Sequence, residues 1–275
     1  ALRRLGMNAG DQDPAAVREV GAELRGAGLE VATVGGSGRQ KGAEEGGGGK
    51  IYMVRAGLFR DADVVLDWHP GSVNDASPGS SLANKSGKFR FRGLSAHASG
   101  APWRGRSALD AVEAMNHMVD MLREHVPDGT RIHYVITDGG KAPNVVPDFA
   151  EAYYYVRHRD AKIVNEIWDR VVKAAEGAAL GTETRMEQEV VNGVYALLPN
   201  ETLARVVDAN LRTVGGVTYS PEERAFAERI QATLGDNVPS VTQAGSVIPF
   251  VVDAVTFAVS GCGTSSMSLS LMACQ

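Results

Sequence analysis

Cysteine is scarce in this chain. Only two occur among the 275 residues, Cys262 and Cys274, and both lie within the last fourteen positions. Their number and placement fit neither a disulfide framework nor a paired Cys-x-x-Cys zinc site. Long apolar runs are also absent, since none approaches the roughly 18 residues needed to cross a bilayer, and no apolar signal core follows the first residues. We therefore expect no membrane association and a cytoplasmic location.

An excess of positive charge is missing as well. The chain has 28 lysine and arginine residues against 33 aspartate and glutamate residues, which gives a net charge of −5. Because a surface that follows nucleic-acid phosphates needs a broad basic face, nucleic acid is not an expected partner. The hydrophobic fraction of 44% and the charged fraction of 22% are typical of a globular protein. The composition therefore favours a protein that acts on a small molecule or a peptide.

Two further absences concern the C-terminal part. No histidine follows His158, and the 46 residues after Arg229 contain no lysine, arginine or glutamate. A change of reading frame in the encoding DNA near each end would account for this shift in composition. The hypothesis fails if neither alternative frame of that DNA restores a histidine-containing tail.

The N-terminal residues show the pattern of a parallel sheet covered by helices. Apolar residues recur at helical spacing over 14–27, after Asp13 and a proline, and again over 51–59. Short apolar runs at 29–34 and 63–67 predict buried strands. The alternation of strand, helix and strand favours an α/β domain with a mostly parallel sheet.

A turn-rich stretch at 72–80 precedes a second unit. Strands and helices are expected there in the order β-α-β-β-α-β, which is that of a ferredoxin-like sandwich. The predicted strands are 88–93, 131–137, 151–157 and 185–191, and the predicted helices are 107–125 and 161–179.

Helical patterns return over 201–212 and over 220–234, and we expect these helices to rejoin the first domain. The predicted fold is therefore α/β, a mostly parallel sheet domain into which a ferredoxin-like βαββαβ domain is inserted. Residues 1–83 form the first part of the sheet domain, 84–193 the inserted domain, and 194–275 the second part, whose tail after about residue 235 is atypical.

An acidic pair and one histidine are candidates for metal chemistry. Glu44 and Glu45 lie side by side in a loop that ends in four glycines, where a parallel sheet usually forms its crevice. Two adjacent carboxylates repel each other unless a proton or a cation lies between them. They could hold a divalent ion and supply a base to water, or form a solvated acidic loop. His69 ends the next predicted strand, where an imidazole can bind a metal ion or act structurally.

Three residues of the second unit are candidates for substrate contacts. His97 lies in a loop after the first strand and could donate a hydrogen bond to a carbonyl oxygen that gains charge, or cap the following helix. Asn144 lies in a turn between strands and could bind a carboxylate or an amide. Arg157 ends the next strand, and its planar fork suits a carboxylate, although a surface ion pair is the alternative.

Four segments in order carry a family resemblance: 43–50 with its acidic pair and glycines, Trp68-His69-Pro70, the loop and helix start at 93–111, and 140–147. Together they resemble the M20 metallopeptidase family, in its amidohydrolase branch. The resemblance extends over roughly residues 1–235.

The resemblance implies a two-domain hydrolase with two zinc or manganese ions, whose smaller domain is a lid and a dimer interface. By position, Glu44 is the general base, Glu45 and His69 are metal ligands, His97 is an oxyanion donor that reaches the partner subunit's site, and Asn144 binds substrate. It also implies a small amide substrate, either an N-acyl amino acid or a p-aminobenzoyl-glutamate-like amide. The expected assembly is a homodimer or a heterodimer with a related subunit.

The chain departs from the family in its remaining metal ligands. The family's upstream Gly-Cys-Gly-His motif and its C-terminal histidine do not occur. We therefore expect a chain that is incomplete at both ends, binds metal weakly and turns over little substrate. Two alternatives are a non-catalytic dimerisation or interaction module and a binding protein that keeps the cleft without the chemistry.

Overall fold

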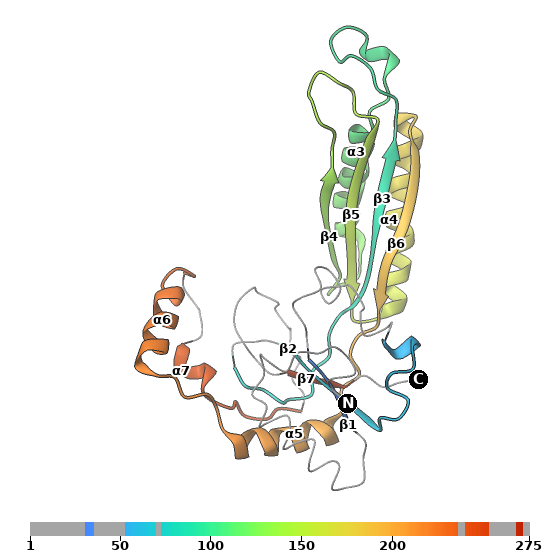
Figure 1. The fold of residues 1–275 in the computed structure, drawn as a ribbon. Coiled ribbons are helices and arrows are strands. Elements are labelled where there is room, and N and C mark those ends of the chain that lie inside the picture. Colours follow the sequence, from blue (N-terminus) through green and yellow to red (C-terminus); the bar gives the residue numbers. More distant parts are fainter. Residues whose placement is uncertain (1–30, 36–52, 70–72, 236–239, 253–267, 272–275) are drawn as a thin grey trace. The chain divides into compact units, whose positions relative to one another are not determined.

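A computed structural model describes residues 31–35, 53–69, 73–235, 240–252 and 268–271 (Figure 1). They form two compact units, one from the described parts of the chain up to Ser81 and from Leu197 onward, and the other from Leu82 to Ala196. Within these described ranges, no helix is both long enough and apolar enough to cross a membrane.

The first unit contains a three-stranded sheet in the order β1-β2-β7. Its strands are β1 (Val31–Gly35), β2 (Val64–His69) and β7 (Ser268–Leu271). β1 and β2 run parallel with Gly35 opposite Trp68, whereas β7 is antiparallel to β2. The strands predicted at 29–34 and 63–67 are present. Only one of the two pairs is parallel, however, so the described strands do not form the mostly parallel sheet that the sequence predicts.

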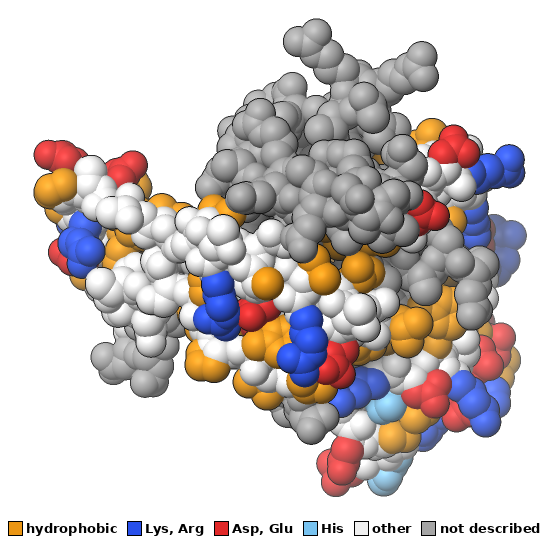
Figure 2. Space-filling model, turned by 90° about the horizontal axis from the view of Figure 1, so that it is seen from below, with side chains coloured by type: hydrophobic (Ala, Val, Ile, Leu, Met, Phe, Trp, Pro, Cys, Tyr) orange, Lys and Arg blue, Asp and Glu red, His pale blue; other side chains and the backbone are white. Residues whose placement is uncertain are grey.

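Three helices follow in the same unit: α5 (Glu201–Val214), α6 (Pro221–Gln231) and α7 (Val241–Ala244). α5 packs Val207 and Leu211 against Leu66 of β2 and the buried Ala76. Its outer side carries pairs of opposite charge four residues apart, which lie next to one another on the described surface seen from below (Figure 2). This pattern is typical of a helix with one buried and one solvated face.

The helix predicted over 51–59 is wrong in its extent. Within the described part, helical backbone covers only 53–55, and Gly57 follows with a φ of 72°. The N–H of Leu58 then donates to the carbonyl of Met53 over 3.1 Å. A glycine in the left-handed region is a common helix terminator. The apolar spacing concealed this ending, because Phe59 beyond it is also buried.

The second unit is a four-stranded sheet with both of its long helices on one face (Figure 1). The sheet order is β4-β5-β3-β6, and every neighbouring pair is antiparallel. The β-α-β-β-α-β order is the one that the sequence predicts. The elements are β3 (Ala83–Arg92), the short helix η2 (Pro102–Arg104), α3 (Ala108–Leu122), the short helix η3 (Arg123–His125), β4 (Arg131–Asp138), β5 (Phe149–His158), α4 (Ala161–Thr182) and β6 (Arg185–Val194).

Alternation along the strands builds the core of this unit. Phe89 and Phe91 of β3 are fully buried beneath the helices, because successive side chains of a strand point to opposite faces. The Phe89 ring lies 5.5 Å from the ring of Trp168 on α4 and 5.6 Å from that of Tyr154 on β5, measured between centroids. These aromatic contacts join the sheet to the helix layer.

Candidate functional site

Two loops meet at the end of the sheet where β3 finishes and β5 begins. One contains His97 and the other contains Asn144. The N–H of Ala98 donates to the carbonyl of Asn144 over 2.9 Å, and His97 and Val145 form an isolated antiparallel bridge. Main-chain hydrogen bonds thus bring two sequence-predicted residues, 47 positions apart, onto adjacent segments.

Close packing keeps these two loops aligned. The N–H of Val146 donates to the carbonyl of Ala96 over 2.9 Å. A Cβ at Gly105 would lie 2.9 Å from Cγ1 of Val146, and one at Gly93 would lie 1.9 Å from the carbonyl oxygen of Arg106. Since real Cβ atoms do not approach other atoms that closely, both positions require glycine.

The same loops expose apolar side chains beside the polar ones. Trp103 is 71% exposed, Leu94 57% and Val145 44%, and the His97 side chain is exposed as well. Exposed large apolar groups that gather on one part of a surface are typical of binding sites. This loop pair therefore offers an imidazole, an amide and apolar surface to a ligand or a partner.

Arg157 lies toward the opposite end of β5. Eight residues separate it from Phe149 at the loop end, which corresponds to about 26 Å at ~3.3 Å per residue. Its Nε is buried and, like Oδ1 of Asn84 and Oγ of Ser86, has no hydrogen-bond partner in the described part of the chain. The structure therefore does not bring Arg157 together with His97 and Asn144 within one chain.

The surroundings of Arg157 are positively charged. The pKa of His133 on β4 lies below its ordinary value of 6.5, because burial disfavours the imidazolium and the charges of Arg157, Arg123 and Arg131 repel it. A region in which an imidazole is kept neutral by nearby guanidinium groups suits an anionic group.

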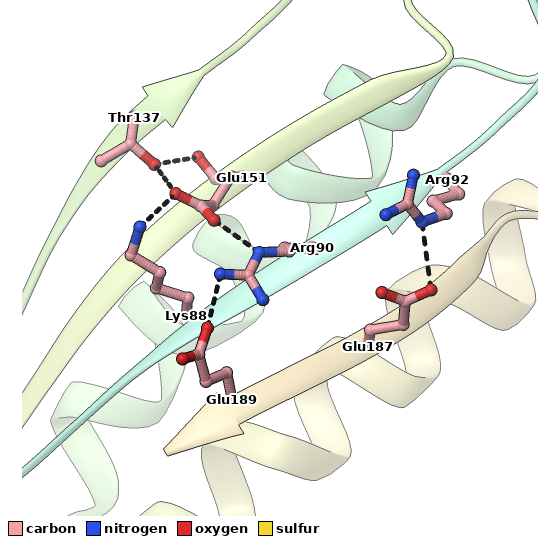
Figure 3. Close-up of polar contacts among 7 residues, drawn as sticks. All are labelled: Lys88, Arg90, Arg92, Thr137, Glu151, Glu187 and Glu189. Carbon is pink, nitrogen blue, oxygen red and sulfur yellow. Dashed lines mark hydrogen bonds and ion pairs between the residues drawn. The ribbon is translucent and has the colours of Figure 1, made fainter. Parts of the chain in front are cut away.

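A charge network occupies the sheet face that the helices leave uncovered, and sequence reasoning missed it (Figure 3). The Glu151 carboxylate accepts hydrogen bonds from Lys88 Nζ over 2.9 Å, Arg90 Nε over 2.6 Å and Thr137 Oγ1 over 2.7 Å. Arg90 also donates to Glu189 on β6 over 2.5 Å. Basic residues at every second position of β3 and acidic ones at every second position of β6 were the available signal, because such residues share one face.

Hydrogen bonding decides the ionisation of Glu151. Burial favours the neutral acid, but the hydrogen bonds from Lys88, Thr137 and Arg90 outweigh it and lower the pKa of Glu151 from its ordinary value of 4.5 to about 2. The carboxylate is 11% exposed at the side chain, so it is a buried anion that neighbouring cations keep ionised. The network is an element of stability on the open sheet face.

The remaining predicted residues are only partly accessible to description. Glu44 and Glu45 lie outside the described residues, and for His69 only the backbone, at the end of β2, is described. Because β1 and β2 are parallel, His69 ends its strand at the edge where the chain leaves β1 at Gly35. Among the described side chains, no three His, Cys, Asp or Glu residues gather to hold a metal ion.

The comparison with protein families places the second unit. A family model described as the peptidase dimerisation domain, M20_dimer, matches residues 83–183. The chain therefore carries a peptidase dimerisation domain of the M20 family, and the predicted family resemblance is confirmed.

Similarity to individual proteins is strongest among named hydrolases. One of the two subunits of p-aminobenzoyl-glutamate hydrolase from Escherichia coli (strain K12) is 45% identical over 195 residues, which cover 70% of this chain and 40% of that protein. The Xaa-Arg dipeptidase of Mus musculus is 32% identical over 174 residues, which cover 63% of this chain and 40% of that protein. The chain thus spans 40% of the length of these curated relatives.

Solved structures include a match to the aminobenzoyl-glutamate utilization protein from Klebsiella pneumoniae. Its TM-score is 0.44 at 24% sequence identity, and the match covers 79% of this chain and 52% of that one.

Proposed function

We propose that this chain is part of an M20-type amidohydrolase that cleaves the amide bond of N-acyl amino acids or p-aminobenzoyl-glutamate-like substrates. The observation that carries the proposal is the main-chain pairing of the His97 and Asn144 loops, in a chain 45% identical over 195 residues to a hydrolase of p-aminobenzoyl-glutamate. An imidazole and an amide held on adjacent segments can stabilise a carbonyl oxygen and orient an amide substrate.

In this proposal residues 1–83 and 194–275 belong to the catalytic domain, and residues 84–193 form the lid and dimerisation domain. The compact unit from Leu82 to Ala196 and the match over 83–183 support the second assignment. The enzyme would act as a homodimer or as a heterodimer with a related subunit.

Glu45 and His69 are assigned as ligands of a divalent ion, and Glu44 as the base that takes a proton from the attacking water. The parallel pairing of β1 and β2 supports this, because it brings the end of β1 and His69 to one edge of the sheet, where such folds place their sites. When bound, zinc or manganese would make water more acidic and polarise the amide carbonyl. Carboxylate oxygen and imidazole nitrogen are suitable donors for these ions.

Arg157 is assigned to the carboxylate of the substrate. Its buried Nε lacks a hydrogen-bond partner among the described residues, and its basic surroundings favour an anion. Because about 26 Å of strand separates Arg157 from the His97 end, one small substrate cannot contact both within one chain. We therefore assign His97 and Asn144 to a substrate bound by a second copy or a related subunit.

The test combines metal analysis with turnover. The chain, purified and incubated with zinc or manganese, is assayed on p-aminobenzoyl-glutamate and on N-acyl amino acids, and its bound metal is measured. About two bound ions per chain with amide hydrolysis support the enzyme, and weak binding with slow turnover is expected because part of the family's ligand set is missing from the sequence. Hydrolysis that persists at the same rate after complete metal removal contradicts the proposal.

The role of His97 has its own test. His97→Ala should lower kcat by roughly 100-fold, the effect of removing one oxyanion donor, and leave KM nearly unchanged. Ser95→Ala, in the same loop, is the matched control and should retain turnover. A change confined to KM would remove His97 from the transition state.

A non-catalytic dimerisation module is the second candidate. The family match is confined to residues 83–183, and this unit has a hydrophobic core of its own. Dimerisation without bound metal and without hydrolysis, measured by sedimentation and metal analysis, favours the module. Calorimetric binding of N-acyl amino acids without hydrolysis favours a binding protein.

A further inference from the structure

The ring of His97 is held by the main chain that follows it. Its Nδ1 accepts a hydrogen bond from the N–H of Gly100 over 3.0 Å and from the N–H of Ser99 over 3.3 Å. The Ser99 hydroxyl lies 3.2 Å from the same nitrogen. The N–H of Ala101 donates to the His97 carbonyl over 3.0 Å, so the backbone turns tightly around the imidazole.

These contacts determine which ring nitrogen carries the proton. A backbone N–H can only donate, so Nδ1 must offer its lone pair to Gly100 and Ser99. A proton on Nδ1 would instead point at two other N–H groups. In the neutral ring the proton is therefore on Nε2, which makes Nε2–H the donor available to a ligand.

Gly100 leaves room for the ring. A Cβ at this position would lie 3.3 Å from Nδ1 and 3.5 Å from Cγ of His97. These distances are at the limit of ordinary contact, so a methyl group there would displace the ring by a few tenths of an ångström. The Gly100 backbone has no positive φ, so alanine would act through this contact and not through backbone strain.

We propose that Ser99 and Gly100 are positioning residues, whose backbone N–H groups fix the Nε2–H tautomer of His97 and aim that donor away from the loop. The catalytic meaning rests on the proposed function, in which His97 donates to the developing oxyanion. A neutral donor whose proton position is already set needs no rearrangement when the charge forms. The proposal about the ring itself concerns this loop alone.

Nuclear magnetic resonance tests the tautomer without any activity. In the neutral ring of 15N-labelled protein, we expect Nδ1 of His97 to resonate as an unprotonated nitrogen, with a scalar coupling to the Gly100 amide nitrogen across the hydrogen bond. His158 is an internal reference, because its Nδ1 accepts from the Asp160 N–H over 2.9 Å and its Nε2 lies 3.1 Å from the Asp128 carbonyl oxygen. A protonated Nδ1 in His97, or the absence of that coupling, overturns the proposal.

Two variants separate the main-chain contacts from the side chain. Gly100→Ala should abolish the coupling at His97 and leave the His158 signals unchanged, whereas Ser99→Ala keeps both N–H donors and should preserve the tautomer. In active enzyme, Gly100→Ala should lower kcat roughly tenfold with KM nearly constant, because ring misplacement weakens transition-state contacts. An unchanged coupling and kcat in Gly100→Ala contradict the positioning role. Failure of hydrolysis in every variant and in the parent contradicts the proposed function and leaves the tautomer result intact.

Discussion

Replacing Glu151 by glutamine tests whether the charge network stabilises the fold. The substitution keeps the size of the side chain and removes the charge that Lys88 and Arg90 share. A carboxyl pKa lowered from 4.5 to about 2 corresponds to about 3 kcal/mol of folding free energy when the group is ionised. Arg90 retains its contact with Glu189, so we expect Glu151→Gln to cost about 2–3 kcal/mol near neutral pH.

The pH dependence gives the sharper result. Because the folded-state pKa of Glu151 lies below the unfolded value, this contribution is complete above the unfolded pKa of about 4.5 and disappears as the pH falls toward 2. Denaturant unfolding should therefore show the two proteins converging in stability as the pH falls across that interval, while the difference persists at higher pH.

Glu187→Gln is the matched control. Glu187 pairs with Arg92 on the same two strands, but both side chains are about half exposed, so its loss should cost less than about 1 kcal/mol. Equal stability of Glu151→Gln and the parent at neutral pH would refute the reasoning. A stability difference that did not shrink in acid would also refute it, because the cost would then not arise from the charge.

Three other substitutions probe packing in the second unit, each measured by denaturant unfolding. Phe89→Ala should cost about 3–5 kcal/mol, because it removes a fully buried ring from its contacts with two other aromatic side chains; a loss below about 1 kcal/mol contradicts the assigned core. Tyr154→Phe should cost about 1–3 kcal/mol, because it leaves the buried Asn116 oxygen without its donor, and an unchanged midpoint contradicts that bond. Gly105→Ala should cost about 1–3 kcal/mol by pressing on Val146, and Val146→Ala should recover part of the loss; additive losses in the double variant contradict the contact.

Much of the second unit could be predicted, since its strands alternate and its helices carry a single apolar stripe. The boundaries were less accessible. β3 begins at Ala83, five residues before the predicted start at 88, because Lys85 and Gly87 occupy positions on the helix side. Lys85 remains there by placing its Nζ 5.5 Å from the Trp168 ring centroid, a tertiary contact that no local pattern reveals.

The candidate site was predictable in its residue types and not in its distances. Sequence order suggested that His97, Asn144 and Arg157 belong to one unit. Only the register of β5 shows that Arg157 lies at the opposite end from the other two. The contacts of Ser99 and Gly100 with the imidazole escaped prediction because they involve main-chain N–H groups, which every non-proline residue has.

The pairing of the two loops through main-chain atoms has a consequence for engineering. Alignment of these loops depends on peptide groups at Ala96, Ala98 and Asn144, so the side chains of Asn144 and Val145 can be exchanged without removing the bonds that align them. Libraries randomised at these two positions, with Gly93 and Gly105 kept constant, should therefore sample new ligand preferences on an intact scaffold.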